Sequence, residues 1–449
     1  MSDTNHLLER VVAHAEARGA TQADAVAFDV VEGSVRVRLG EIEELTRSKE
    51  RQLGLRVFVG QRSAMSSTSD LREDALLRFV DGVVAMARVT AEDPNAGLPD
   101  PSSTAARHVA DDPELYDPAA EAFDLERGVE WCREAERAAM ADPRIKNSEG
   151  AAFGFASGTR AFRASGGVAG SYRTSSFSGS VTPIAEQDGA MERDYWWTAR
   201  RRLAALDQPA EVGRVALERT LRRLGARRLS TGERPVVFDP ATASSLLRHL
   251  ASAVNAYTVY RGASVLASRL GTVIGSPLLT LVDDGTLGGG MATRPYDGEG
   301  LGSRRTVIVS EGRLESWICD TYSGRKVGHG STANAARGVA DAPTAAPSNL
   351  HLAAGETSPD QLLAGIADGL YVTELIGFGV NVTTGDFSQG AAGLRIKDGA
   401  LDHAVSEVTI AGNLLDMLRD IEAVGSDLDT SRALSAPSLR LSRMMVAGE

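Results

Sequence analysis

The spacing of apolar residues changes within the first 60 residues from the period of a helix to that of a strand. Over residues 5–17 apolar residues recur every three or four positions, which predicts a helix. Over residues 26–39 and 53–59 they alternate with polar residues, which predicts strands, with Glu32-Gly33 as the turn between the first two. A second helix is expected from Asp70, with Glu73 in capping-box position. Residues 1–90 therefore predict a small α+β domain.

The rest of the chain divides by composition into three segments. Residues 91–118 are rich in Asp, Pro, Ala and Ser, which indicates a linker. Residues 119–228 predict a central α+β domain, with a helix over 121–141, twisted strands over 150–162 and 166–180, and a helix over 191–224. Residues 229–449 predict short strands punctuated by glycine, including 235–238 and 439–446, with hairpin turns at Glu311-Gly312 and Asp398-Gly399. A helix that carries Leu414, Met417, Leu418 and Ile421 is expected before Gly425. The predicted class is multidomain α+β, with largely antiparallel sheets and flanking helices.

The helix expected over residues 191–224 carries a basic face. This face is a candidate partner surface, although a solvated helix face explains the same charge pattern more simply. Its members are Arg200, Arg201, Arg202, Arg214, Arg219, Arg222 and Arg223.

Charge and cysteine content restrict the class of function. Sixty acidic and 48 basic side chains leave a formal charge of -12, which disfavours binding to nucleic acid or to an anionic membrane. Two cysteines, Cys132 and Cys319, imply no disulfide framework and suit a reducing compartment. No secretory signal is recognised at the N-terminus, and no apolar run is long enough for a membrane span. A cytoplasmic protein is expected.

No local motif indicates a complete catalytic site. The closest two of the seven histidines, His6 and His14, are eight positions apart, whereas a helical zinc site needs a spacing of three or four. His-Glu-x-x-His, Cys-x-x-Cys, Gly-x-Ser-x-Gly and P-loop motifs are absent from the sequence. A site assembled from distant ligands stays open. The acidic pair Asp283-Asp284 could bind a cation, but turn chemistry with Gly285 is the simpler interpretation.

Two polar, glycine-containing loops stand out as candidate site loops. One surrounds His329 in the run Gly328–Asn334, and the other is Thr383–Ser388. Loops of this composition often carry function. A structural hydrogen bond for His329 and an Asx turn at Asp386 are the simpler alternatives.

A series of motifs in the C-terminal half resembles the TldD/TldE (PmbA) family, and within it the TldE/PmbA branch. The motifs occur in the family's order, and the series is more specific than any one of them. They include Val282-Asp283-Asp284-Gly285, Tyr296-Asp297-Gly298-Glu299-Gly300, Gly330-Ser331-Thr332-Ala333-Asn334-Ala335-Ala336-Arg337, Gly369-Leu370-Tyr371-Val372-Thr373-Glu374 and Asn381-Val382-Thr383-Thr384-Gly385-Asp386-Phe387-Ser388.

The resemblance implies a role in a zinc metalloprotease. The family's TldD subunit holds zinc with a His-Glu-x-x-x-His helix and a downstream cysteine, and pairs with a TldE subunit that lacks them. The two enclose a chamber that cleaves unfolded peptides. Here the corresponding helix, residues 244–255, contains His249 but neither the general-base Glu nor the second His. The resemblance therefore implies a subunit that is inactive alone and carries no cofactor, with zinc in a TldD-like partner.

The implied substrates are unfolded peptides such as peptide-antibiotic precursors or antitoxins, and the two polar loops are the candidates for lining the chamber. Two alternatives remain: an autonomous metallohydrolase with ligands from Asp283, Asp284, His329 and Asp386, and a non-enzymatic binding protein of gyrase-modulator type. The sequence leaves open whether the isolated chain forms a homodimer. The chamber candidates are His329, Ser331, Asn334, Arg337, Thr384, Asp386 and Ser388.

Overall fold

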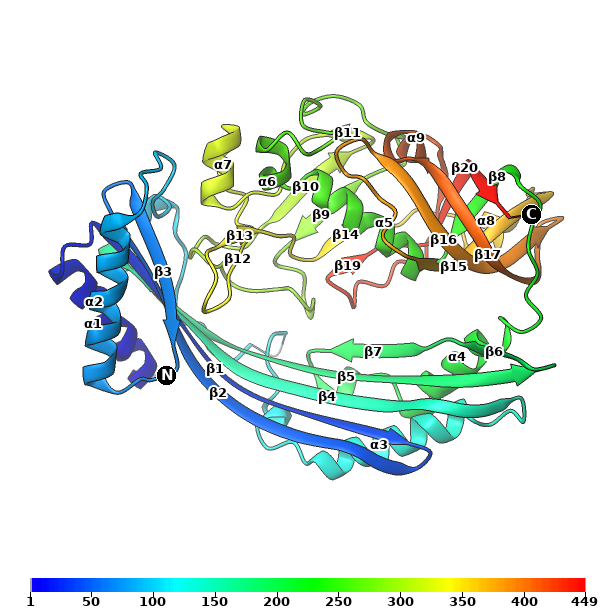
Figure 1. The fold of residues 1–449 in the computed structure, drawn as a ribbon, viewed down its shortest axis with the longest axis horizontal. Helices are drawn as coiled ribbons and strands as arrows, with labels where there is room; N and C mark the ends of the chain where they lie inside the picture. Colours follow the sequence, from blue (N-terminus) through cyan, green and yellow to red (C-terminus); the bar gives the residue numbers. More distant parts are fainter. Residues whose placement is uncertain (1, 113, 449) are drawn as a thin grey trace.

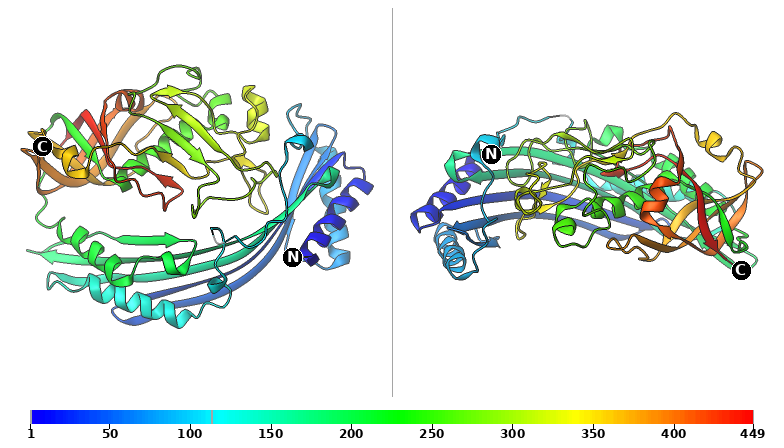
Figure 2. Two further views of the ribbon diagram at one scale, coloured as in Figure 1. Left: turned by 180° about the vertical axis from the view of Figure 1, so that it is seen from behind. Right: turned by 90° about the horizontal axis from the view of Figure 1, so that it is seen from above.

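A long curved sheet and a C-terminal domain seated against its inner side make up the molecule (Figures 1 and 2). The computed structural model describes residues 2–112 and 114–448. Helices lie outside the sheet, and strands of the C-terminal domain lie above it in Figure 1. The predicted α+β class, with largely antiparallel sheets and flanking helices, is confirmed.

The curved sheet has the order β3-β2-β1-β4-β5-β6, and β7 also pairs with β5. All its pairings are antiparallel. β1 pairs with β4 from Asp24–Ala164 to Val37–Ala151, so the segments expected as N-terminal and central domains contribute to one sheet. The strands are β1 (Gln22–Arg38), β2 (Glu41–Val59), β3 (Arg62–Thr68), β4 (Ile145–Ala164), β5 (Ala169–Gln187), β6 (Ala190–Arg193) and β7 (Trp196–Arg200).

The turn expected at Glu32-Gly33 is wrong, because β1 continues through it and turns only at Leu39-Gly40. Gly33 serves close packing instead. A Cβ at Gly33 would lie 2.5 Å from Cε1 of Phe155 on the neighbouring strand β4. Glycine in a strand signals a close approach as well as a turn, and the sequence alone does not separate the two.

Four helices cover the outer face of the sheet (Figure 1). α1 (Ser2–Ala17) and α2 (Glu73–Val89) pack on alternate residues of β1 and β2, including Ala25 and Leu55. α3 (Leu125–Ala139) and α4 (Pro209–Leu221) cover the other end, over Phe153 and Phe177. The capping box expected at Asp70 does not form. α2 begins at Glu73 with no side-chain cap, and Asp70 pairs with Arg72 instead.

The helix expected over residues 191–224 is also wrong in its first half. Residues 190–193 and 196–200 are the strands β6 and β7, and the helix α4 begins at Pro209. Trp196 and Trp197 favour a strand, and Pro209 fits the first turn of a helix, where no N–H is needed. The predicted basic face therefore has no continuous helix beneath it.

The C-terminal domain has two main sheets. One has the order β17-β16-β15-β8-β20-β18, and β20 also pairs with β17, which closes a ring of five strands. The other has the order β11-β10-β9-β14-β19, and β12 pairs with β13. The strands are β8 (Gly232–Phe238), β9 (Leu281–Asp284), β10 (Arg305–Ser310), β11 (Arg313–Leu314), β12 (Ala335–Ala336), β13 (Thr344–Ala345), β14 (Leu350–Leu352), β15 (Asp368–Ile376), β16 (Asp386–Lys397), β17 (Ala400–Asn413), β18 (Ile421–Val424), β19 (Leu434–Ser435) and β20 (Leu439–Ala447).

Both predicted hairpins are present, at β10–β11 and β16–β17. The helix expected to reach Ile421 ends earlier, at Arg419, and Ile421 begins β18. Within the described residues no helix is both long and apolar enough to cross a membrane. The helices of this domain are α5 (Pro240–Ala253), α6 (Ala256–Tyr260), α7 (Thr321–Val327), α8 (Pro359–Leu363) and α9 (Leu414–Arg419).

The segment expected as a linker, residues 91–118, runs between the sheet and the C-terminal domain. It includes the 3-10 turn Pro101–Ser103, and it buries Leu98 and Tyr116. Bridges tie Thr104 to Leu301 and His108 to Ser171. The segment therefore contacts both parts of the molecule.

Candidate functional site

Helix α5 is the element on which the family resemblance predicts the zinc motif of a catalytic relative. Asp239 caps it, accepting a hydrogen bond from Thr242 N at 2.8 Å, and Pro240 occupies the first turn. Leu246, Leu247 and Leu250 pack into the domain core. The opposite face is not fully buried, and consists of Ala241, Ser245, Arg248, His249 and Ser252.

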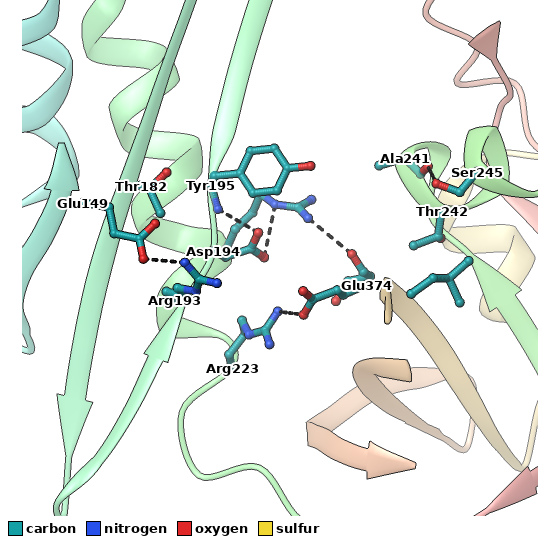
Figure 3. A pocket seen from close by; sticks show the side chains of 13 residues that line it. Glu149, Thr182, Arg193, Asp194, Tyr195, Arg223, Ala241, Thr242, Ser245 and Glu374 are labelled. Atoms are coloured by element: carbon teal, nitrogen blue, oxygen red, sulfur yellow. Dashed lines mark hydrogen bonds and ion pairs between the residues drawn. The ribbon is translucent and has the colours of Figure 1, made fainter. Parts of the chain in front are cut away.

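A cavity of about 320 Å³ lies at the N-terminal end of this face (Figure 3). It separates the far end of the curved sheet and α4 from α5 and β15. Charged and hydroxyl side chains dominate its wall. The lining residues include Glu149, Thr182, Arg193, Asp194, Tyr195, Arg219, Arg223, Thr242, Ser245 and Glu374.

Two arginines of α4 and its C-terminal end span this cavity. Arg219 lies 3.3 Å from Asp194 Oδ2 and donates from Nη1 to Asp239 Oδ2 at 3.5 Å, so it links the sheet to the cap of α5. Arg223 donates to Glu192 and, across the joint, to Glu374 of β15. We call this set of ion pairs the open joint, because it borders the large cavity.

The ion pair of Glu374 and the hydroxyls of Thr242 and Ser245, which line this cavity, are each held by a partner within the chain. Burial disfavours the charge of Arg223, but the hydrogen bond and charge of Glu374 outweigh it and raise the pKa of Arg223. The hydroxyl of Ser245 donates to Ala241 O, and that of Thr242 donates to Asp239 Oδ1 at 2.9 Å. Neither hydroxyl is hydrogen-bonded to a histidine that could act as a base.

The exposed face of α5 carries one arginine, Arg248, beside His249. Burial and the neighbouring Arg248 lower the pKa of His249, which favours its neutral form.

Burial raises the pKa of both Cys132 and Cys319 to about 12, so neither thiol is readily ionised. Over residues 2–112 and 114–448, no group of three or more His, Cys, Asp and Glu side chains is placed to hold a metal ion.

The first predicted loop is split between surface and interior. His329 is exposed, just beyond the αL glycine that ends α7. Ser331 accepts a hydrogen bond from Ala333 N and lines a separate cavity beside the 91–118 segment. Asn334 and Arg337 point inward: Asn334 donates to Asp283 Oδ2 at 2.7 Å, and Arg337 Nη1 donates to Asp24 Oδ1 at 2.8 Å.

The second predicted loop lies at the start of β16. Thr384 donates to Asp386 Oδ2 at 2.6 Å, and the backbone N–H of Ser388 donates to Gly379 O. All three side chains are on exposed residues. Among the described residues, no side-chain hydrogen bond joins this loop to the first one. Whether any of the seven candidates contacts a peptide stays a prediction.

The dispersed metal ligands of the autonomous-hydrolase alternative are not gathered into one site. Asp283 is buried, and it accepts from Asn334 and from Ser348 N. Asp284 accepts from Thr286 N and Oγ1, which confirms the turn interpretation. His329 and Asp386 lie on the exposed loops described above.

Sequence reasoning missed the partners of Arg337. Asp24 and Arg56 face each other on β1 and β2, Arg56 donates to both Asp24 and Glu299, and all of these side chains are at most 10% exposed. Burial disfavours the charge of Asp24, but Arg337 and Arg56 outweigh it and lower its pKa. A charge between alanines in Ala23-Asp24-Ala25 is the one local signal that could have pointed to this network, which we call the sealed joint.

The architecture, a curved sheet facing a barrel-containing domain across polar joints, defines the class of protein. Models of domain 1, the central domain and the C-terminal domain of PmbA/TldA metallopeptidases match residues 23–87, 118–224 and 231–448. The chain belongs to this PmbA/TldD metallopeptidase family, as its ordered motifs predicted.

Individual relatives agree with that assignment. Metalloprotease PmbA of Escherichia coli O157:H7 is 38% identical over 435 residues, 96% of this chain and 94% of the relative. A PmbA homolog of Haemophilus influenzae is 35% identical over 96% of this chain and 94% of its own length. A Bacteroides thetaiotaomicron structure described as a candidate modulator of DNA gyrase is 27% identical, with a TM-score of 0.91 and full coverage of both chains. TldE of Thermococcus kodakarensis shares the fold, with a TM-score of 0.89 at 18% identity, 98% coverage of this chain and 100% of its own.

Proposed function

We propose that this chain is the non-catalytic, TldE/PmbA-like subunit of a heterodimeric zinc metalloprotease that degrades or processes unfolded peptides. A TldD-like partner supplies zinc, its bound water and the general base. This chain contributes walls of the substrate chamber. Its free, buried cysteines suit the reducing cytoplasm, where we place it.

The observation that carries the proposal is the exposed face of α5. A catalytic relative would present two histidines and a glutamate there, whereas this face presents Arg248, His249 and Ser252. The guanidinium of Arg248 disfavours a divalent cation at this position by direct repulsion. The face is therefore suited to forming a wall and unsuited to holding zinc.

Two further features support a peptide-binding wall. Ser34, Thr46, Ser48, Ser176 and Ser178 line a hollow of about 350 Å³ on the inner face of the sheet, where hydroxyls can meet peptide groups without selecting a sequence. β3 pairs only with residues 53–59 of β2. Residues 41–52 of β2 thus have an edge without a neighbouring strand in the described chain, which can pair with an added strand.

The test is to measure zinc by mass spectrometry and peptide cleavage with the chain alone, and then mixed with the TldD-like protein of the same genome. We expect no stoichiometric zinc and no cleavage alone, and cleavage on mixing. A His249→Ala variant should keep the mixed activity within about twofold, because His249 has no catalytic role here. Stoichiometric zinc in the lone chain would refute the proposal. Loss of the mixed cleavage activity in His249→Ala would refute it as well.

A further inference from the structure

A second, smaller cavity lies where the inner face of the sheet meets residues 294–298 of the C-terminal domain. Its volume is about 50 Å³, which exceeds the space that one water molecule needs. Phe162 and Tyr172 of the sheet line it, together with three arginines: Arg160, Arg294 and Arg337. Arg160 is exposed, whereas the side chain of Arg337 is 1% exposed, so the cavity runs from a charged mouth to a buried charge.

In two of these arginines, Arg294 and Arg337, the guanidinium edge formed by Nε and Nη2 has no hydrogen-bond partner. Arg337 donates from Nη1 to Asp24, but its Nε and Nη2 have no hydrogen-bond acceptor and are buried. Nε and Nη2 of Arg294 are likewise buried without an acceptor. A buried donor without a partner is costly, and a guanidinium edge without one is therefore an indication of a missing acceptor.

The chemistry of that acceptor follows from other arginines of this chain. Arg18 donates hydrogen bonds to Asp81 from Nε and Nη2 at 2.8 and 2.9 Å. Arg144 donates to Asp142 from the same two atoms at 2.9 and 2.8 Å. The Nε/Nη2 edge is the fork that takes both oxygens of a carboxylate. Arg294 and Arg337 each leave this fork unused beside one cavity.

The acidic groups nearby are already engaged by other donors. Asp24 accepts from Arg56 and from Nη1 of Arg337, and Glu299 accepts from Arg56 and from Thr321 N. Asp297, which also lines the cavity, accepts three backbone N–H groups, from Glu299, Leu301 and Ala335. Among the described residues, the carboxylates near the two forks are therefore all engaged by other donors.

We propose that this cavity binds a carboxylate of a peptide substrate, with Arg294 and Arg337 as the forks and Arg160 at the mouth. That the ligand is a peptide rests on the proposed function. The fork atoms are buried beside Phe162 and Tyr172, and burial in a low-dielectric environment strengthens a charge-assisted hydrogen bond. A terminal carboxylate and a Glu side chain present the same two oxygens, so either is a ligand of this site.

The experiment compares binding of three fluorescently labelled, unstructured hexapeptides to the full chain without its partner. One has a free C-terminal carboxylate, one is C-terminally amidated, and one is amidated with a single internal Glu. We expect the free acid to bind about tenfold or more tightly than the neutral amide, as charge-assisted pairs require. Tight binding of the Glu peptide as well would identify the side chain as a second source of the carboxylate.

Arg294→Gln is the decisive variant. Nε and Nη2 of Arg294 make no hydrogen bond within the chain, so the substitution removes none of the fold's hydrogen bonds at these two atoms. It should reduce the acid-to-amide ratio to about one. Arg222→Gln is the matched control: Nε and Nη2 of Arg222 also lack partners, but Arg222 does not line this cavity, so the ratio should be retained.

Equal binding of acid and amide to the wild-type chain would overturn the proposal, and so would an unchanged ratio in Arg294→Gln. Since the assay uses the chain alone and measures no cleavage, its outcome is independent of the mixing experiment. A failure of zinc-dependent cleavage on mixing would refute the subunit role and leave the carboxylate site standing.

Discussion

The sealed joint and the Arg223–Glu374 pair of the open joint hold the same two parts of the molecule together with the same kinds of side chain, but Glu374 is far more exposed than any member of the sealed joint. At the sealed joint, Asp24, Arg56 and Glu299 are at most 10% exposed. At the open joint, Arg223 and Glu374 border a cavity of about 320 Å³, and Glu374 is 43% exposed. Burial, and not the number of ion pairs, should decide what each joint contributes to stability.

The largest expected effect is loss of the central cation of the sealed joint. Arg56→Met leaves Asp24 and Glu299 buried with one guanidinium fewer, and breaking a buried pair in this way costs about 3–5 kcal/mol. The free energy of unfolding, measured by urea denaturation, should fall by that amount. A change below about 1 kcal/mol would show that the sealed joint is not energetically distinct.

Close backbone packing at the sealed joint predicts the next effect. A Cβ at Gly54 on β2 would lie 2.0 Å from the carbonyl oxygen of Val339 in the C-terminal domain. Gly54→Ala should destabilise the protein by about 1–3 kcal/mol through overpacking. Gly82→Ala on α2 is the control: its Cβ meets nothing within 4 Å, so the melting temperature should hold or rise.

Asp297, beside the sealed joint, predicts a pH dependence. Burial and the nearby Glu299 raise its pKa from 3.8 to about 7, so between these values the native state holds a proton that the unfolded state lacks. This stabilisation is complete below about pH 4, falls by at most about 1.4 kcal/mol per pH unit, and is gone above about pH 7. Urea denaturation from pH 4 to 8 should show the decline.

Burial also raises the pKa of Asp283 and Asp320, so the decline has several sources. In an Asp297→Asn variant the free energy of unfolding should therefore fall less steeply with pH, but it should still fall. If the free energy of unfolding fell equally steeply with pH in this variant, the whole pH dependence would belong to the other carboxyls and not to Asp297.

The smallest effect is expected at the open joint. Arg223→Met removes contacts to Glu192 and Glu374, which are 24% and 43% exposed and can be solvated once freed. We expect a loss of about 0–1 kcal/mol in the same urea assay. A loss as large as that of Arg56→Met would remove the distinction between the joints.

Local patterns predicted much of the fold. The hairpins at Glu311-Gly312 and Asp398-Gly399, and the strands around Pro235–Phe238 and Leu439–Val446, follow from alternation and turn residues, and all are present. The errors arose where one residue type serves two roles. Gly33 suits a turn but here permits close packing, and Arg200 suits a helix but here ends the strand β7.

The sequence by itself determined the family and the α+β class, because ordered motifs, alternation and turn chemistry are local properties. Only the tertiary structure decided which charges meet. Arg337 pairs with Asp24 across 313 positions of sequence, and Arg56 meets Glu299 across 243. No local pattern encodes such a partner, since the pairing depends on how the curved sheet and the C-terminal domain close on each other. The same closure places the unused forks of Arg294 and Arg337 beside one cavity.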